Sequence, residues 1–310
     1  MCIRDRIDSA VVTRVAARDV SRAQAYAEQH GITDVSESYE ALINADDVDV
    51  VYNPLPINLH HEWTLKALRA GKDVLCEKPF ASNAEQAVEM VSVAKEEGRI
   101  VGEAFHHAYH PMFKRIVEVI QSGAIGTVER AEGYFNISIP QPDIRWDYAT
   151  SGGSLMDLGC YSTTWVRHAV GEEPTVVEAA ATVGPEQIDA NMWAEFEFPG
   201  GATGRIESSL IDEGPGDLSL EVKGSAGSIT AINPLAPQNG NSLTIRTEGG
   251  VTSGEVLGGC TYEHMVRAFG DHVRHGTAFP TQGEDSIQNM AAIDDIYITA
   301  GLAKRAMTTR

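Results

Sequence analysis

The sequence predicts an α/β fold in which a domain with a parallel sheet is followed by an α+β domain with a large, mainly antiparallel sheet. Up to about residue 105, short β-branched runs alternate with helical stretches, which is typical of parallel strands joined by crossover helices. Beyond residue 127 the predicted strands are longer, with few helices between them. The 310 residues suffice for two hydrophobic cores, so we expect domains at 1–107 and 108–310.

In the first domain, capping residues mark where the predicted helices begin and end. Gly31 follows the first helix, and we expect Asn58 to cap the third. Ser82 and Glu85 have the spacing of a capping box at the start of the fourth. The expected strands span residues 11–17, 48–52, 73–76 and 99–104, and the expected helices span 21–30, 38–45, 58–70 and 82–98.

The second domain is expected to begin with a helix that has Pro111 in its first turn and ends near Ser122. Along one predicted strand, Met192, Ala194 and Phe196 alternate with polar residues, so one face of the sheet is expected to be buried. The expected strands span 127–139, 175–183, 191–198, 202–210, 218–222 and 242–247, and further helices are expected at 154–170, 262–275 and 284–304.

Composition and charge exclude several classes of partner. The chain has 24 Lys and Arg against 44 Asp and Glu, a formal net charge of −20, so contacts with nucleic acid or an anionic membrane surface are not expected. There is neither an apolar run approaching the length of a membrane span nor an apolar signal core near Met1, so we expect a cytoplasmic protein. A small-molecule substrate fits this charge balance better.

Neither the cysteines nor the histidines predict a metal centre. The four cysteines are widely spaced, with no C-x-x-C pair, which also argues against a disulfide framework. They are Cys2, Cys76, Cys160 and Cys260. His106 and His110 are close in sequence, but Pro111 breaks the helix that would bring them onto one face. We therefore expect no bound metal.

Polar residues gather behind two successive predicted strands. Tyr52-Asn-Pro-Leu-Pro56 stands at the end of one strand with His60 shortly after it, and Glu77-Lys78-Pro79 follows the next strand. Ligands of open α/β sheets bind at the carboxyl ends of parallel strands. A lone Glu-Lys-Pro tripeptide is more typical of a turn with a solvated lysine. Two such loops in neighbouring units nevertheless favour a ligand site.

A glycine-containing segment, Ser151-Gly-Gly-Ser-Leu-Met-Asp-Leu-Gly-Cys-Tyr161, forms a second candidate site. Asp157 and Tyr161 are four residues apart, so on a helix they share one face and present a carboxylate and a phenol together. The alternative is that Asp157 is a first-turn helix residue and Tyr161 an ordinary half-buried aromatic.

Together these segments resemble the hallmarks of the Gfo/Idh/MocA oxidoreductase family. The matching motifs are Glu77-Lys78-Pro79, Pro54-Leu-Pro-x-x-Leu-His60 and Gly152-Gly-x-Leu-x-Asp157-x-Gly-x-Tyr161, and the similarity covers nearly the whole chain. The tyrosine form of the last motif looks most like the branch of dimeric dihydrodiol dehydrogenases and NADP-dependent D-xylose 1-dehydrogenases. The resemblance implies a Rossmann-type dinucleotide-binding domain followed by a domain for substrate binding and dimerisation.

The resemblance also implies an NAD(P)-dependent dehydrogenase that transfers hydride between a nicotinamide and a cyclic sugar or polyol, such as a D-xylose-like aldose oxidised at C1. Its site must stabilise a developing alkoxide and accept a proton. By resemblance, Lys78 supplies positive charge, Asp157 orients the substrate and Tyr161 is the catalytic acid/base. The ammonium is expected to lower the pKa of the phenol. Arg145 is assigned to substrate hydroxyls together with Asp157 and Tyr161.

The cofactor site is assigned by the same resemblance. Arg18, at the end of the first predicted strand, can pair with a 2′-phosphate, which favours NADP, because an acidic residue there usually holds a 2′-hydroxyl. The adjacent Asp19 opposes a phosphate if it turns inward, so NAD is the alternative. The other residues assigned to the cofactor are Asn53, Pro54, Leu55, His60, Glu77 and Lys78.

One hallmark of the family is absent. The family begins with a strand and a G-x-G-x-x-G turn, whereas the first glycine here is Gly31. We therefore expect an N-terminally truncated Rossmann-type domain without its first strand and pyrophosphate cradle, which leaves a gap or an unpaired edge in the sheet. An incomplete gene or a spurious start explains this pattern, and a genuine short form is the alternative.

Two other functions stay open. A trans-dihydrodiol dehydrogenase belongs to the same branch, and a non-catalytic sugar-binding or regulatory protein fits the missing phosphate turn. The joint presence of Lys78, Asp157 and Tyr161 opposes the non-catalytic alternative. The large predicted sheet can bury a face against a second copy, so we expect a homodimer or a higher homo-oligomer.

Overall fold

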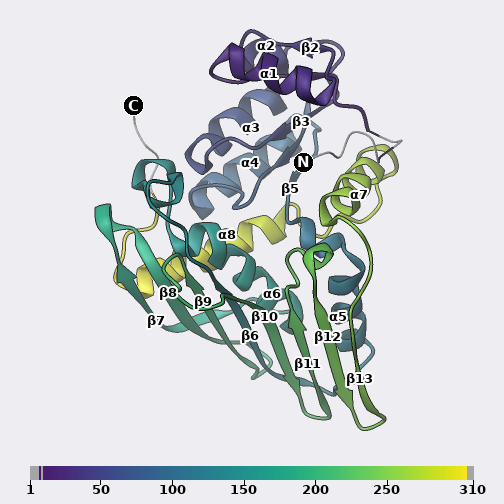
Figure 1. Ribbon diagram of the computed structural model, residues 1–310, viewed down its shortest axis with the longest axis vertical. Coiled ribbons are helices and arrows are strands. Elements are labelled where there is room, and N and C mark those ends of the chain that lie inside the picture. The colour runs from purple at the N-terminus through teal and green to yellow at the C-terminus, as the bar shows by residue number, and fades with distance from the viewer. Residues whose placement is uncertain (1–6, 8–9, 306–310) are drawn as a thin grey trace.

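A small α/β part lies against a second part with a large sheet in the computed structural model, which describes residue 7 and residues 10–305 (Figure 1). This arrangement confirms the predicted fold class. The expectation for Cys2 lies outside the described residues, and the other three cysteines are unpaired. Within the described part of the chain, every helix is too short or too polar to cross a membrane.

The N-terminal part alternates strands and helices, and its fourth strand spans the residues expected from sequence. Its strands are β1 (Arg14–Val15), β2 (Asp34–Val35), β3 (Val50–Asn53), β4 (Asp73–Cys76) and β5 (Val101–Glu103). Its helices are α1 (Val20–His30), α2 (Tyr39–Ile43), α3 (His60–Arg69) and α4 (Ala84–Glu96), and the short turn η1 (Ile57–Leu59) precedes α3.

Local polar contacts fix the ends of α1. The Asp19 carboxylate accepts a hydrogen bond from the backbone N–H of Ser21 at 2.9 Å and so caps the first turn. The helix ends at Gly31, whose left-handed φ of 59° is a conformation that glycine adopts without strain. The predicted end of this helix is therefore confirmed.

Two predicted caps are wrong. Leu59 precedes α3 without a side-chain hydrogen bond, because η1 occupies the turn where Asn58 was expected to cap. The cap of α4 is Asn83 rather than Ser82, since the Asn83 side chain accepts from the backbone N–H of Gln86 at 3.0 Å. The Gln86 side chain in turn accepts from the backbone N–H of Ser82, one residue before the cap, so the pattern resembles a capping box without being reciprocal.

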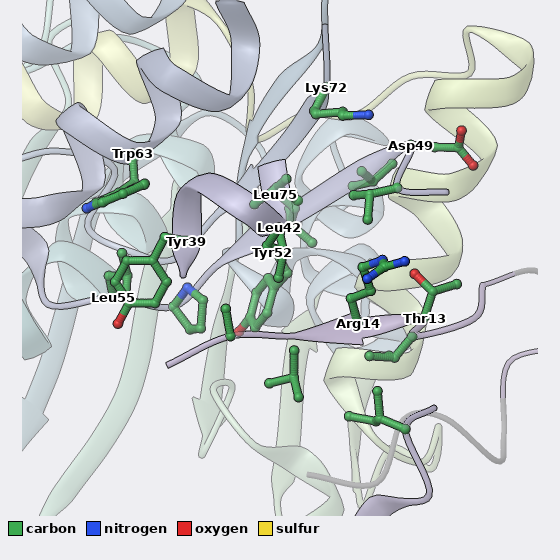
Figure 2. Close-up of a pocket in the computed structure, with 18 of the residues that line it drawn as sticks. Thr13, Arg14, Tyr39, Leu42, Asp49, Tyr52, Leu55, Trp63, Lys72 and Leu75 are labelled. Atoms are coloured by element: carbon green, nitrogen blue, oxygen red, sulfur yellow. The ribbon is translucent and has the colours of Figure 1, made fainter. Parts of the chain in front are cut away.

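The parallel sheet is divided in two. β1 pairs with β2, while β3, β4 and β5 pair in that order, and no ladder joins β1 to β3 among the described residues. A cavity of 2480 Å³ lies between the two pieces, lined by residues 10–19 on one side and 48–52 on the other (Figure 2). The sheet therefore contains the gap expected from the sequence.

The C-terminal part is built on one eight-stranded sheet with the order β13-β12-β11-β10-β6-β9-β8-β7. Every neighbouring pair is antiparallel except β6 with β9. Two strands, β11 and β13, were not predicted. The strands are β6 (Val128–Asn136), β7 (Thr175–Val183), β8 (Asp189–Glu197), β9 (Thr203–Ser209), β10 (Asp217–Gly224), β11 (Gly227–Ile232), β12 (Ser242–Thr247) and β13 (Gly250–Gly254).

Helices cover the face of this sheet that looks toward the N-terminal part (Figure 1). They are α5 (Pro111–Gln121), α6 (Cys160–Val170) and α8 (Glu284–Thr299), while α7 (Thr261–His275) packs beside the turn η2 (His106–Tyr109). Met192, Ala194 and Phe196 are buried as their alternation predicts. In β6, a Cβ at Gly133 would lie 2.9 Å from the backbone oxygen of Ser162, so glycine permits the close approach of α6.

A buried carboxylate at the start of β8 ties distant segments together. Asp189 is fully buried and its Oδ1 accepts from Arg305 Nη2 at 2.5 Å and from the Tyr297 hydroxyl at 2.9 Å. Its Oδ2 accepts from the backbone N–H of Leu155 at 2.7 Å and from the hydroxyl of Ser154 at 3.0 Å. The sheet, α8 and the turn before α6 are thus held by one group.

Replacing Asp189 with alanine is expected to lower the free energy of unfolding by about 3–5 kcal/mol, because Arg305 then keeps a buried charge without its partner. Urea denaturation at pH 7 measures this change. The control is Glu129→Ala, which breaks a surface pair with Lys223 and is expected to change the same quantity by about 1 kcal/mol or less. Equal losses in both variants contradict the assignment.

Candidate functional site

Two loops at the carboxyl ends of parallel strands form one side of the candidate site. Asn53 of β3 is the register partner of Cys76 of β4, so the loops that start at Pro54 and Glu77 leave the sheet side by side. The buried Asn53 side chain donates to Thr64 Oγ1 at 3.2 Å and thereby anchors the first loop to α3. Asn53 lines neither of the two cavities described here.

His60 links these two loops. Its Nδ1 lies 2.9 Å from the carbonyl oxygen of Pro79, and its Nε2 lies 2.7 Å from that of Leu55. Burial lowers the His60 pKa to about 4, so the ring is neutral and its single N–H donates to one of the two carbonyls at a time. The ring is 1% exposed and fixes the distance between the loops.

The other side of the site is the turn that precedes α6. A Cβ at Gly152 would lie 2.4 Å from a backbone oxygen, and one at Gly153, where φ is +132°, would lie 2.1 Å from Asp189 Oδ1. Glycine is therefore required at both positions, because the Arg145 backbone approaches Gly152 closely and the Asp189 side chain approaches Gly153 closely. The next residues form η5 (Leu155–Gly159), a π-helical turn that presents Asp157.

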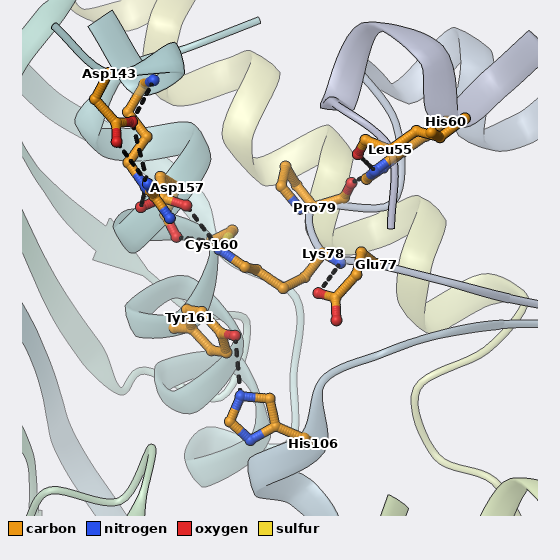
Figure 3. A network of polar contacts seen from close by, with 11 residues as sticks. Leu55, His60, Glu77, Lys78, Pro79, His106, Asp143, Asp157, Cys160 and Tyr161 are labelled. Carbon is orange, nitrogen blue, oxygen red and sulfur yellow. Dashed lines mark hydrogen bonds and ion pairs between the residues drawn. The ribbon is translucent and has the colours of Figure 1, made fainter. Parts of the chain in front are cut away.

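The two sides meet at Asp157 (Figure 3). Lys78 Nζ donates to Asp157 Oδ1 at 2.9 Å and to the Asp157 backbone oxygen at 2.8 Å. Arg145 Nε donates to Oδ2 at 2.6 Å, and Arg145 also pairs with Asp143 at 3.1 Å. A cavity of 160 Å³ lies beside this network. Its lining includes the predicted Pro54, Leu55, His60, Glu77, Lys78, Arg145 and Asp157.

Electrostatics keep this network ionised. Burial alone disfavours a charged Asp157, but the neighbouring Lys78 and Arg145 outweigh burial and hold its pKa below the usual value. Burial also opposes the Lys78 ammonium, and Asp157 overcomes it, so the Lys78 pKa is raised. At neutral pH the site therefore presents a fixed ammonium, a guanidinium and a carboxylate.

Tyr161 lies in α6 next to this network without lining either cavity. Lys78 Nζ lies 4.9 Å from the centre of its ring, and its hydroxyl lies 3.2 Å from His106 Nε2 (Figure 3). The prediction of a lowered phenol pKa is wrong, because burial raises the Tyr161 pKa well above its ordinary value. The Lys78 charge is bound to Asp157, so Tyr161 carries its proton.

Two aromatic residues near the site were not assigned to it from sequence. His106 was considered only as a metal ligand, although it stands just past β5, where the rule on carboxyl ends of strands applies. Tyr262 at the start of α7 stacks on His106 with ring centres 4.1 Å apart. No local sequence pattern indicates that contact. The described part of the chain contains no cluster of three or more side chains placed to bind a metal.

Arg18 lies far from this network, at the large cavity beyond β1. Its backbone N–H donates to the Tyr39 hydroxyl at 3.1 Å, and its side chain is exposed. Asp19 also lines this cavity, and one of its carboxylate oxygens accepts from the backbone N–H and the hydroxyl of Ser21 at the start of α1. The loop Pro54–Pro56 lines both cavities and connects them.

The described residues fit both nucleoside ends of a dinucleotide. Glu77 and Lys78 line the small cavity, and Arg18 lines the large one. Phosphates bind the backbone N–H groups of a glycine turn at a helix N-terminus. The described part of the chain contains no such turn between β1 and β3. The described residues therefore supply cavity walls on both sides of the divided sheet, and no pyrophosphate cradle occurs among them.

The chain matches the model "Oxidoreductase family, NAD-binding Rossmann fold" over residues 2–105 and the model "GFO/IDH/MocA C-terminal domain" over residues 113–230. The chain belongs to the Gfo/Idh/MocA oxidoreductase family. The resemblance inferred from the motifs is confirmed, as is the Rossmann-type nature of the N-terminal part.

Two relatives in this family cover 92% and 67% of this chain. A D-xylose 1-dehydrogenase (NADP(+)) of Haloferax volcanii is 33% identical over 92% of this chain and 88% of its own length. A trans-1,2-dihydrobenzene-1,2-diol dehydrogenase of Xenopus tropicalis is 30% identical over 67% of this chain and 64% of its own. The structure of a 3-ketoreductase from Actinomadura kijaniata in complex with NADP and TDP-benzene has a TM-score of 0.84 at 28% identity, covering 93% of this chain and 89% of that one.

Replacing Asp157 with asparagine is expected to destabilise the protein at pH 7 by about 3 kcal/mol, because Lys78 and Arg145 lose their shared counter-charge. Since the folded-state pKa of Asp157 lies below the unfolded value, this stabilisation is complete above about pH 4 and is lost as the pH falls further. Urea unfolding of both proteins between pH 7 and pH 3 measures the difference.

The control for this pH series is Asp46→Asn at an exposed position, for which we expect little change at any pH. A difference between wild type and Asp157→Asn that stays constant down to pH 3 contradicts the lowered pKa.

Proposed function

We propose that this protein is an NAD(P)-dependent oxidoreductase that transfers hydride between a nicotinamide cofactor and a CH–OH group of a cyclic sugar or polyol. The observation that carries the proposal is the Lys78–Asp157–Arg145 network, which places two cations and a carboxylate beside a small cavity at the ends of parallel strands. The similarity to a D-xylose 1-dehydrogenase supports an aldose oxidised at C1 as the leading substrate.

In the proposed mechanism, a bound nicotinamide supplies or accepts the hydride. Lys78 stabilises negative charge that develops on the substrate oxygen, because its raised pKa keeps it an ammonium. Asp157 and Arg145 bind neighbouring hydroxyls of the substrate. Tyr161 retains its proton at neutral pH and acts as the acid that returns a proton to the substrate oxygen in the direction of reduction.

The loops at the ends of β3 and β4 form the wall against which the cofactor is held. Pro54, Leu55 and His60 provide the apolar surface, and Glu77 accepts the hydroxyl of Tyr52 between the two cavities. Asn53 contributes indirectly, by holding the first loop to α3. These contacts orient the reacting groups and limit the access of water.

NADP is the cofactor that the residues at the large cavity favour. Arg18 offers a guanidinium at the end of β1, and Asp19 is occupied by the cap of α1. The name of the Haloferax volcanii relative and the ligand of the 3-ketoreductase structure support the same choice. NAD is the alternative.

The divided parallel sheet favours a second candidate function, a non-catalytic sugar-binding or regulatory protein. A further alternative within the enzymes is a trans-dihydrodiol dehydrogenase, which the similarity to the Xenopus tropicalis protein supports. The retained charges at Lys78, Asp157 and Arg145 favour catalysis, since sugar binding alone requires no buried ammonium.

One set of assays separates these functions. The protein is titrated with NADPH by fluorescence and then assayed at 340 nm with D-xylose, other aldoses and an aromatic trans-dihydrodiol. Reduction of NADP with an aldose supports the proposal, and reduction only with the dihydrodiol supports the first alternative. Sugar binding without any binding of NADPH overturns the proposed enzymatic function and supports the non-catalytic one.

We further propose a homodimer or higher homo-oligomer, a cytoplasmic location and a domain division into 1–107 and 108–310. The face of the large sheet opposite to the helices is open to a second copy (Figure 1). The last strand of the parallel sheet ends at Glu103 and α5 begins at Pro111, which supports the boundary.

Replacing Lys78 with alanine is expected to lower kcat at least about a hundredfold, because the group that stabilises the developing charge is removed. Steady-state kinetics with NADP and the best aldose measure this change. The control is Lys66→Ala, a partly exposed lysine of α3 that pairs with Glu62. Near-normal turnover in Lys78→Ala contradicts the assigned role.

Replacing Arg18 with alanine is expected to weaken binding of NADPH about tenfold or more while leaving NADH little changed, because only NADPH has a 2′-phosphate for the guanidinium. Fluorescence titration gives both Kd values. Arg69→Ala removes an equal charge at an exposed site away from the cavities and serves as the control. An equal effect on both cofactors places Arg18 away from the 2′-phosphate.

A further inference from the structure

Two neighbouring histidines behind Tyr161 have different surroundings. His106 and His107 form the start of η2, and they are 4% and 0% exposed. His106 Nε2 lies 3.2 Å from the Tyr161 hydroxyl. Neither nitrogen of His107 has a hydrogen-bond partner in the described part of the chain, and its ring packs among Phe105, Phe113 and Trp165. Of the two, His106 alone is in polar contact with a proposed catalytic residue.

The second nitrogen of His106 decides where the ring carries its proton. Nδ1 is buried and has no partner among the described residues. Burial and the charge of Lys78 lower the His106 pKa to about 3, so the ring is neutral and has one N–H. A proton on Nδ1 leaves a buried N–H without an acceptor, which is rarer in proteins than an unpaired acceptor.

The Tyr161 hydroxyl can adapt to either arrangement, whereas the ring of His106 cannot. A phenol is the better donor and an imidazole nitrogen the better acceptor, which by itself favours donation from Tyr161. However, the hydroxyl hydrogen rotates about the C–O bond and can turn away from His106, while a ring N–H points in one direction. The unpaired Nδ1 therefore places the His106 proton on Nε2, facing Tyr161.

The ring of His106 is also held in place from its other side. Tyr262 stacks on it with ring planes 23° apart, and Tyr262 itself is half-buried at the start of α7. This contact favours the ring plane in which Nε2 faces Tyr161. His106 is thus fixed between a ring that it stacks on and a hydroxyl that it contacts.

We propose that His106 is a positioning residue for Tyr161: its Nε2–H donates to the phenol oxygen, so that the Tyr161 hydrogen is directed to a substrate oxygen. This proposal rests on the proposed function. In the direction of reduction, the Tyr161 O–H bond breaks and its proton forms an O–H bond with the substrate oxygen, while the substrate carbon gains hydride from the reduced nicotinamide. The phenolate keeps the hydrogen bond from Nε2–H, has Lys78 beside its ring, and regains a proton from water.

The first test needs no activity. The side-chain nitrogens of [15N]histidine-labelled protein are observed by long-range 1H–15N NMR at pH 7, and the His106 signals are assigned by their loss in His106→Gln. The proposal predicts a pyrrole-type shift for Nε2 and a pyridine-type shift for Nδ1. The reverse pattern, or an imidazolium with two protonated nitrogens, overturns it. A protein without turnover contradicts the proposed function and leaves this readout intact.

The second test compares three variants in the direction of reduction. His106→Leu is expected to lower kcat about 10- to 100-fold with little change in KM, since a hydrogen bond to a charged intermediate is lost. His106→Gln keeps an amide donor near the position of Nε2 and is expected to recover most of kcat. His107→Leu removes a buried imidazole with no hydrogen bond and is the matched control.

Urea denaturation of each variant separates folding from function. If His106 acts only through packing, kcat follows the free energy of unfolding, and kcat of His106→Gln is no higher than that of His106→Leu. Equal kcat in the leucine and glutamine variants, or equal losses in His106→Leu and His107→Leu, overturns the positioning role.

Discussion

The carboxylate of Asp157 is the group on which the candidate site depends, because it binds Lys78 from the N-terminal part and Arg145 from the C-terminal part at once. Lys78 is largely buried and needs this partner, whereas Arg145 is partly exposed and also pairs with Asp143; Asp157 needs both cations to stay ionised against burial. The glycine pair, the π-helical turn and the buried Asp189 place this one carboxylate. A shift of the turn separates the charges and changes the site as a whole.

Much of the fold could be predicted from sequence because its signals are local. The alternation along β8 predicts one buried face, and the apolar residues of Asp73–Cys76 predict a strand buried on both faces. β13 (Gly250–Gly254) could not be predicted in this way, since all of its residues are exposed and its place depends on pairing with β12. β11 follows β10 after a short turn at Ser225 and Ala226, and it is placed in the sheet by pairing with β10 and β12.

The candidate site could likewise be predicted only in part. Lys78 and Asp157 belong to recognisable motifs, so both could be predicted as site residues from the sequence. In the structure, Lys78 Nζ lies 2.9 Å from Asp157 Oδ1. The environment of Tyr161 could not be inferred from its neighbours in sequence. Its ring contacts Phe105 and Phe135, which come from other strands and turns, and their packing raises the pKa that a charge-based argument lowers. The stacking of Tyr262 on His106 likewise exists only in three dimensions.

The contact between Arg305 and Asp189 also sets an order of events during synthesis. Arg305 donates to the backbone oxygen of Gly152 and accepts from the side chain of Asn83 through its own carbonyl, so it joins both halves of the molecule. A ribosome makes this residue after all of the others that surround the site. The contacts of Asp189 with Arg305 can therefore form only after translation has passed that point, later than those with Ser154, Leu155 and Tyr297.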